Sequence, residues 1–207
     1  MMFLKNCSSC RVILFILMAV LLPLLTVSGK EPSLEKISLG IEFGNWQPHS
    51  LNDEPQFTTF GAAGATPYYG VSCGVPLGRG FGLRVSLGYW SLRDLEEVET
   101  VHSLTLHPLT LDIKYRLIPD YWVSAYVIYG GGVYWGVENE TSPFGKRLRK
   151  AQAGWGGNLG AGFDLALTSH FVLGMTFQYH YVRFKDALGG VDDFSGPKIT
   201  GGMSILF

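Results

Sequence analysis

The last ten residues, Lys198-Ile-Thr-Gly-Gly-Met-Ser-Ile-Leu-Phe207, alternate in character along their length. Successive side chains of an extended strand point to opposite faces, so every second residue shares a face. One face is apolar, and the other is made mostly of small or polar residues. The apolar face consists of Ile199, Gly201, Met203, Ile205 and Phe207. The stretch therefore predicts a two-faced β-strand. A strand of a soluble β-sandwich would show the same alternation, so the rest of the chain has to decide between the two.

Seven earlier stretches repeat the period of two. They cover residues 37–47, 67–77, 80–92, 103–117, 121–137, 153–167 and 171–181. The last of them alternates most clearly, with Phe171, Leu173 and Phe177 among the apolar residues of one face. The stretch at 121–137 is apolar on both faces, so its register stays open. Together with the C-terminal stretch, the pattern predicts eight strands.

The strand at 103–117 alternates cleanly only in its second half. Leu104 and Leu106 fall on the face that is polar further along the strand, and Pro108 lies between the two halves. Proline has no N–H to donate to a neighbouring strand. We therefore expect a β-bulge, or an edge of regular pairing, near His107.

The connections between the predicted strands alternate in length. Tight turns rich in turn-forming residues are expected at 77–80, 118–120 and 168–169. Longer connections are expected at 48–66, 93–102, 138–152 and 185–197. Outer-membrane barrels have short turns and both termini at one end and longer loops at the other. The alternation favours an all-β fold, an eight-stranded antiparallel up-and-down transmembrane β-barrel.

The N-terminus has the pattern of an export signal. Lys5 and Arg11 precede an apolar run that contains Pro23 and ends near Gly29. The run is shorter than the roughly 20 residues that a membrane-spanning helix needs. We interpret residues 1–29 as a Sec signal peptide and residues 30–207 as one barrel domain. An N-terminal anchor that is not cleaved is the alternative.

Composition narrows the class of protein. Charged residues make up 16% of the chain, below the average of about 25% for soluble proteins, and glycine is abundant with 27 residues. Removal of the signal would take Cys7 and Cys10 and leave Cys73, which excludes a disulfide framework. Loss of the two cations in the signal changes the net charge from −1 to −3, too near neutral to indicate a nucleic-acid partner. No later apolar run is long enough for a spanning helix, so any passage through a membrane would be by strands.

The glycine-rich polar faces would coat a soluble surface poorly, and we therefore place them inside the barrel. They leave room for bulky inward residues, for which Trp46, Trp90, Trp122 and Tyr126 are the candidates. The inferred interior is nearly balanced in charge and comprises Glu42, Arg84, Asp112, Lys114, Arg116, Asp164 and Lys198. Buried charges persist only when they are paired, so we predict a salt-bridge network that fills the lumen. A polar conduit through the barrel is the alternative.

Aromatic residues gather near the expected strand ends. Those at the loop side are Tyr69, Tyr89, Trp135, Trp155, Tyr179 and Tyr181, and those at the turn side are Tyr115, Tyr121 and Phe207. Such rings favour the headgroup level of a bilayer, so they are candidates for two aromatic girdles. Ordinary aromatic packing is the alternative.

From residue 37 to Phe207 the chain resembles the small eight-stranded outer-membrane barrels of the OmpX, OmpW and OmpA-barrel type. The segments 108–116 and 170–181 resemble strands of the general outer-membrane β-barrel domain. The resemblance implies a bacterial outer-membrane location after Sec export, with periplasmic termini. The terminal Phe207 resembles the C-terminal signature that the outer-membrane assembly machinery is understood to recognise. These families include structural proteins, adhesins, small pores and lipid-modifying enzymes, so the resemblance does not decide activity.

The sequence lacks the usual arrangement of catalytic side chains. Lipid A deacylases of similar fold carry a His-x-Ser pair, because a serine nucleophile needs a histidine base. The comparable place here, His180-Tyr181-Val182, lacks the serine. The histidines and Cys73 do not show metal-ligand spacing. We therefore expect a non-enzymatic protein without a cofactor or metal, and we expect His180 to make hydrogen bonds in the lumen.

The predicted loops carry charge of opposite sign. The connection at 93–102 is acidic, with Asp94, Glu96, Glu97 and Glu99, and the connection at 138–152 is basic, with Lys146, Arg147, Arg149 and Lys150. Guanidinium groups match phosphate oxygens, so the basic run is a candidate contact for lipopolysaccharide phosphates. A solvated loop that pairs with its acidic neighbour is the alternative. We expect a monomeric surface or envelope protein with membrane lipid as its surroundings, and a narrow channel for small or hydrophobic solutes is the alternative function.

Overall fold

The computed structural model describes residues 36–52, 66–93, 101–117, 122–141 and 147–207. Nearly all of the described chain is β-strand, with one short 3-10 helix. The elements are β1 (Ser38–Trp46), η2 (His49–Asn52), β2 (Pro67–Gly78), β3 (Phe81–Arg93), β4 (Val101–Arg116), β5 (Val123–Thr141), β6 (Arg147–Ala166), β7 (Phe171–Leu188), β8 (Val191–Asp193) and β9 (Gly196–Leu206). Within these ranges, no helix is both long enough and apolar enough to cross a bilayer.

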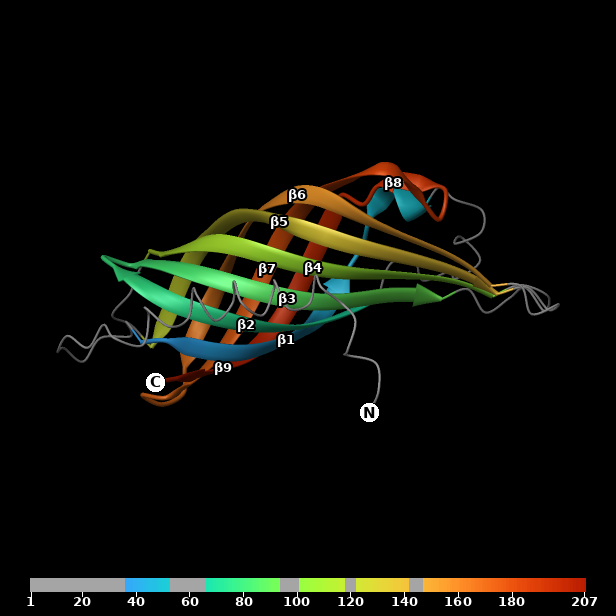
Figure 1. The fold of residues 1–207 in the computed structure, drawn as a ribbon. Helices are drawn as coiled ribbons and strands as arrows, with labels where there is room; N and C mark the ends of the chain where they lie inside the picture. The colour runs from blue at the N-terminus through green and yellow to red at the C-terminus, as the bar shows by residue number, and fades with distance from the viewer. Residues whose placement is uncertain (1–35, 53–65, 94–100, 118–121, 142–146) are drawn as a thin grey trace, which may run out of the picture. The chain divides into compact units, whose positions relative to one another are not determined.

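The eight long strands form a closed antiparallel wall. Strands β1 to β7 pair in chain order, β9 pairs with β7 and with β1, and every pairing is antiparallel. Figure 1 shows these strands side by side around one interior, with the short β8 next to the end of β7. The predicted eight-stranded antiparallel up-and-down β-barrel is confirmed.

Two of the predicted short turns, those at 77–80 and 168–169, lie at one end of the barrel, and the third, at 118–120, lies outside the described residues. The turn between β2 and β3 has positive φ at Gly78, Arg79 and Gly80, a backbone conformation that favours glycine and suits a two-residue hairpin turn. The turn between β6 and β7 lies near the start of β1, because Lys36 Nζ donates to Ser169 O at 3.0 Å. At the same end, Phe207 N donates to the carbonyl of Ile37 at 2.9 Å, which connects the residue after β9 to the residue before β1. We call this end the turn end and the opposite one the loop end.

Two of the expected long loops are largely strand. Strands β5 and β6 pair without interruption from Val123↔Leu165 to Thr141↔Arg147, so residues 138–141 and 147–152 of the expected loop lie in strands. Likewise, β7 continues to Leu188 and turns through Gly189 and Gly190, both with positive φ, into β8. Sequence reasoning missed these extensions because it required an apolar outward face. Strands can pair through their backbones without an apolar outward face, as they do here.

Of the two alternatives expected near His107, the bulge is wrong, and the edge of regular pairing is found on the side of β3. Strand β4 keeps one register with β5 along its whole length, through His107↔Trp135 and Pro108↔Tyr134. Its pairs with β3 stop at Leu87↔Leu109 and resume at Trp90↔Leu106 in the same register. Proline therefore interrupts the pairing on one side without inserting an extra residue, as expected from its missing N–H.

Candidate functional site

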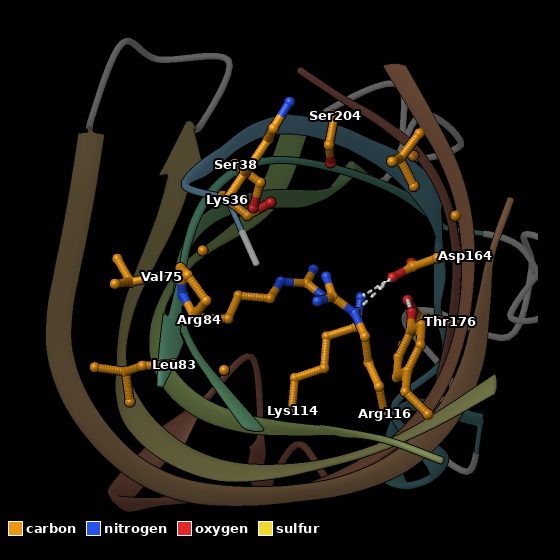
Figure 2. Close-up of a pocket in the computed structure, with 18 of the residues that line it drawn as sticks. Lys36, Ser38, Val75, Leu83, Arg84, Lys114, Arg116, Asp164, Thr176 and Ser204 are labelled. Carbon is orange, nitrogen blue, oxygen red and sulfur yellow. Dashed lines mark hydrogen bonds and ion pairs between the residues drawn. The ribbon is translucent and has the colours of Figure 1, made fainter. Parts of the chain in front are cut away.

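The interior of the barrel is the candidate site, because polar and charged side chains of all eight long strands meet there. At the turn end, Arg84 of β3 forms an ion pair with Glu42 of β1; Glu42 is buried and Arg84 is partly buried. Lys114 Nζ of β4 lies 2.6 Å from Asp164 Oδ2 of β6, and Arg116 Nε lies 3.7 Å from the same oxygen. Figure 2 shows Arg84, Lys114 and Arg116 extending from the wall into the interior, with Asp164 facing the last two.

The other two charged residues placed inside by sequence reasoning, Asp112 and Lys198, make contacts of a different kind. Asp112 Oδ1 accepts a hydrogen bond from Asn158 Nδ2 at 2.7 Å, and its Oδ2 accepts one from Thr110 Oγ1 at 3.1 Å. Lys198 is buried with its Nζ 4.4 Å from the centre of the Tyr68 ring, a cation–π geometry. The structure thus brings Glu42, Arg84, Lys114, Arg116 and Asp164 into two ion-paired groups, and it holds Asp112 and Lys198 by other contacts.

A polar layer crosses the middle of the lumen. Gln178 Nε2 donates to Asn158 Oδ1 at 3.0 Å, and Asn158 donates in turn to Asp112, so three strands are connected. His180 Nδ1 and Tyr134 Oη form a hydrogen bond of 2.8 Å in the same region. His180 therefore makes the lumenal hydrogen bond that the sequence suggested, and its ring packs 5.4 Å from that of Trp46. The layer thus connects the interior charge of Asp112 to polar side chains of β6 and β7.

At the loop end the interior becomes apolar, which sequence reasoning did not foresee. A cluster of buried side chains fills it, and we call these residues the loop-side apolar cluster. It comprises Trp46, Leu51, Tyr68, Trp90, Leu104, Leu106, Tyr134, Val182, Phe184, Leu188, Val191 and Phe194. Leu104 and Leu106 do not lie on a wrong face: they point inward in the same register as Asp112. The presence of Leu104 and Leu106 on the same strand face as Asp112 was the signal in the sequence that could have predicted this apolar cluster.

Inward glycines make room for inward aromatic rings. A Cβ at Gly162 would lie 2.5 Å from Tyr126 Oη, and one at Gly156 would lie 2.8 Å from Tyr134 Cε2. Of the four bulky residues predicted to point inward, Trp46, Trp90 and Tyr126 are buried inside. Trp122 is 70% exposed, so its prediction is wrong. It directly precedes β5, and its carbonyl accepts a hydrogen bond from Ala166 N at 2.8 Å, but its side chain is not covered by the barrel.

The outer wall carries an apolar belt. Phe171, Leu173 and Phe177 of β7 are among its exposed residues. From Phe171 to Tyr181 the strand rises about 33 Å, or about 25 Å along the axis of a barrel with the usual strand tilt, which matches the apolar band of outer-membrane barrels. Exposed aromatic residues lie near both ends of the strands. At the loop side they include Tyr69, Tyr89, Trp155 and Tyr181, and at the turn side Phe81, Tyr115, Trp122 and Phe207.

The basic run predicted as a loop lies instead in strand β6. Arg147, Arg149 and Lys150 pair with Thr141, Asn139 and Glu138 of β5. The side chains of Arg149 and Lys150 are exposed, and Lys150 Nζ donates to the carbonyl of Ala187. Lys146 and the acidic residues Asp94, Glu96, Glu97 and Glu99 lie outside the described residues, as do the expected signal peptide and Tyr121.

A smaller charged contact joins β7 to β8 at the loop end. Arg183 and Asp193 approach to 3.9 Å, and the amide of Ser195 donates to Asp193 Oδ1 at 2.8 Å. Partial burial acts to raise the pKa of Asp193, but the hydrogen bonds from Ser195 and the charge of Arg183 outweigh it and lower the pKa below its ordinary value of 3.8. The carboxylate form of Asp193 thus stabilises the end of the β7–β8 hairpin.

The histidines do not assemble a metal site in the described chain. His107 lies on the outer wall with its ring 5.5 Å from that of Tyr89, and His170 bonds to the neighbouring Ser169 at the exposed turn. Within the described ranges, no cluster of three or more His, Cys, Asp or Glu side chains has the geometry to hold a metal ion.

Comparison with solved structures identifies the fold class of the chain. Neither a family model nor a curated protein sequence matches the chain. Among solved structures, a major outer membrane protein from Thermus thermophilus matches with a TM-score of 0.61 at 14% identity, covering 83% of this chain and 98% of that one. OprG, an outer membrane protein from Pseudomonas aeruginosa, matches with 0.53 at 16% identity, covering 86% and 99%. Ail, the attachment invasion locus protein of Yersinia pestis, matches with 0.52 at 17% identity, covering 83% and 97%. The chain therefore has the fold of the small eight-stranded outer-membrane β-barrels.

Proposed function

We propose that the protein is a non-enzymatic, monomeric integral β-barrel of the bacterial outer membrane with a structural or surface role. The observation that carries this proposal is the reversed polarity of the wall. Phe171, Leu173 and Phe177 are exposed on the outside, whereas Glu42 and Asp112 are buried inside. A soluble barrel needs the opposite arrangement, and the fold likeness to outer-membrane proteins supports the same conclusion.

Membrane insertion is tested with the full precursor, expressed in a Gram-negative host. The mature chain is expected in the outer-membrane fraction and should be extracted only by detergent. A mature chain that stays folded and soluble without detergent would contradict the proposal. The turns and termini are proposed to face the periplasm. Accessibility labelling of a cysteine introduced at Ser169 in a Cys73→Ser background, in intact cells and after the outer membrane is opened, tests this orientation.

The C-terminal strand is proposed to direct assembly. Phe207 closes the chain on the outer wall, where its ring is exposed and its amide is bonded to Ile37. Replacing Phe207 with serine should reduce the amount of folded barrel in cells, while refolding of the purified chain in detergent should change little. A defect confined to refolding would instead assign a structural role to this ring.

The lumen is proposed to be closed, and the loop-side apolar cluster is the feature that supports closure. Trp46, Trp90 and Phe194 in this cluster have no exposed surface. Apolar side chains packed across an eight-stranded barrel leave no path for hydrated ions, because eight strands enclose only enough space for side chains.

Conductance in planar bilayers separates a closed barrel from a narrow channel. The wild-type protein should be silent, and a variant with Trp46→Ala and Phe194→Ala should open intermittently. Trp155→Ala, which removes an exposed ring of the outer wall, is the matched control and should stay silent. Reproducible openings of the wild-type protein would favour the channel for small or hydrophobic solutes.

Lipopolysaccharide is the proposed lipid partner of the loop end. The exposed Arg149 and Lys150 lie on β6 beyond Trp155, whose ring faces outward. Guanidinium and ammonium groups bind phosphate oxygens, so this position suits the phosphates of an outer leaflet. Replacing Lys146, Arg147, Arg149 and Lys150 with glutamine should weaken lipopolysaccharide binding. Unchanged binding would instead support the alternative that these cations are solvated and pair with neighbouring acidic side chains.

A further inference from the structure

The turn-end half of the lumen contains a cavity that the proposed function does not use. Its volume is about 80 Å³, enough for several water molecules or one small oxyanion. Side chains from strands all around the wall line it. They include Lys36, Glu42, Arg84, Lys114, Arg116 and Asp164.

Positive charge exceeds negative charge in the cavity lining. Four cations, Lys36, Arg84, Lys114 and Arg116, stand against two carboxylates, Glu42 and Asp164, so the formal balance is +2. Asp164 serves two of the cations at once, because Lys114 and Arg116 lie 2.6 Å and 3.7 Å from the same oxygen. Burying unbalanced charge is costly, and an anion among these cations would lower that cost.

Serine hydroxyls also line the cavity. Ser38, Ser72 and Ser204 contribute to the lining from β1, β2 and β9. Figure 2 shows Ser38 and Ser204 on the wall opposite Lys114 and Arg116. Guanidinium and ammonium groups on one side and hydroxyls on the other form a donor set suited to a tetrahedral oxyanion.

We propose that this cavity binds a phosphate-sized oxyanion, either a free ion or a phosphate group carried by a larger molecule that enters at the turn end. Arg84, Lys114 and Arg116 hold its charge, and the serine hydroxyls complete its hydrogen bonds. Lys36 lies at the rim, where its Nζ also contacts the carbonyl of Ser169, and it attracts the anion to the opening. This site is a property of the lumen and holds whether or not the barrel conducts ions.

Isothermal titration of the folded barrel with inorganic phosphate tests the site, in an uncharged detergent without phosphate groups and at constant ionic strength set by chloride. Saturable binding with one site per barrel is expected. Arg116→Gln should weaken it about tenfold, the usual worth of a charge-assisted hydrogen bond. Lys36→Gln at the exposed rim should weaken it about threefold through the loss of a nearby charge. Lys185→Gln removes an exposed cation at the other end and should leave the affinity unchanged.

Absence of saturable phosphate binding, or an equal loss in Lys185→Gln, would overturn the proposal. If Arg116→Gln does not fold, as judged by its strand signal in circular dichroism, the comparison of Lys36→Gln with Lys185→Gln decides. A parallel titration with glycerol 3-phosphate identifies the source. Binding of both probes supports a phosphate group carried by a larger molecule, and binding of inorganic phosphate alone supports a free ion.

Discussion

Replacing Arg84 with methionine removes the partner of Glu42 while retaining most of the volume of the side chain. The two side chains form an ion pair near the turn end, and only 12% of the arginine and 6% of the glutamate side chain is exposed. The second carboxylate oxygen of Glu42, Oε2, is buried without a hydrogen-bond partner in the described chain. The variant therefore leaves a buried carboxylate, with only the few water molecules that the turn-end cavity can hold to replace the lost guanidinium.

The expected cost follows from this burial. Breaking a buried ion pair by removing one partner costs about 3–5 kcal/mol. An independent estimate comes from protonation: giving a glutamate a proton at pH 7, from an ordinary pKa of about 4.3, costs about 3.7 kcal/mol. The two figures agree, so we expect Arg84→Met to lower the free energy of unfolding by about 3–4 kcal/mol at neutral pH.

The origin of the cost predicts its dependence on pH. At about pH 5 the same protonation costs only about 1 kcal/mol, so the deficit of Arg84→Met should shrink to roughly that size. Glu42→Gln leaves a guanidinium that cannot lose its proton, so its deficit should persist at both pH values. The double variant should recover much of the loss, because two neutral side chains leave no buried charge unpaired.

Urea unfolding of the barrel in lipid vesicles, followed by tryptophan fluorescence, measures these free energies. A loss below about 1 kcal/mol for Arg84→Met at neutral pH would refute the reasoning, since that is the range of exposed ion pairs. Additive losses in the double variant would do so as well. Either result would mean that the pair is solvated in the membrane-bound protein.

Three further predictions concern other parts of the barrel. Phe177→Arg, on the exposed outer wall, should lower the free energy of unfolding in vesicles by about 2–4 kcal/mol, whereas Ser91→Arg near the loop end should lower it by less than about 1 kcal/mol. Equal losses would contradict the assignment of the apolar belt to the lipid-facing wall. Phe194→Ala, at a position without exposed surface, should cost about 3–5 kcal/mol in the same assay, and a smaller loss would show that the apolar cluster collapses readily. The pKa of Asp193 is lowered, so its stabilising contribution should be present above the ordinary value of 3.8 and lost as the pH falls through the lowered one; the amide NMR signal of Ser195 should follow this transition and should not do so in Asp193→Asn.

The inward and outward faces of most strands could be predicted from the sequence. A period of two needs no knowledge of the partner strand, and it placed Glu42, Arg84 and Asp164 inside from residue parity alone. The same parity placed Phe177 and Ile205 outside, where both are exposed. Trp122 shows where the rule stops, because parity alone does not tell whether a side chain at the end of a strand is covered.

The errors in β4 have one physical cause. Leu104 and Leu106 looked misplaced because the strand was expected to keep a polar inner face throughout its length. The inner face changes from charged near Lys114 to apolar at these leucines, while the register stays constant. Beyond the belt the proposed surroundings of the wall are water, and an apolar core then belongs inside, as in a soluble protein. The altered alternation at Leu104 and Leu106, which suggested a bulge, marks the boundary between the charged and the apolar part of the interior.

The order of strands, their direction, the inward polarity and the tight glycine turn at 78–80 were determined by the sequence, because they depend on neighbouring residues and a repeating period. The partners in the lumen were decided only by the tertiary structure. Lys114 meets Asp164 across 50 positions in the chain, and Asn158 meets Asp112 across 46. The closure and stagger of the wall set which inward side chains share a level, and no local pattern contains that information.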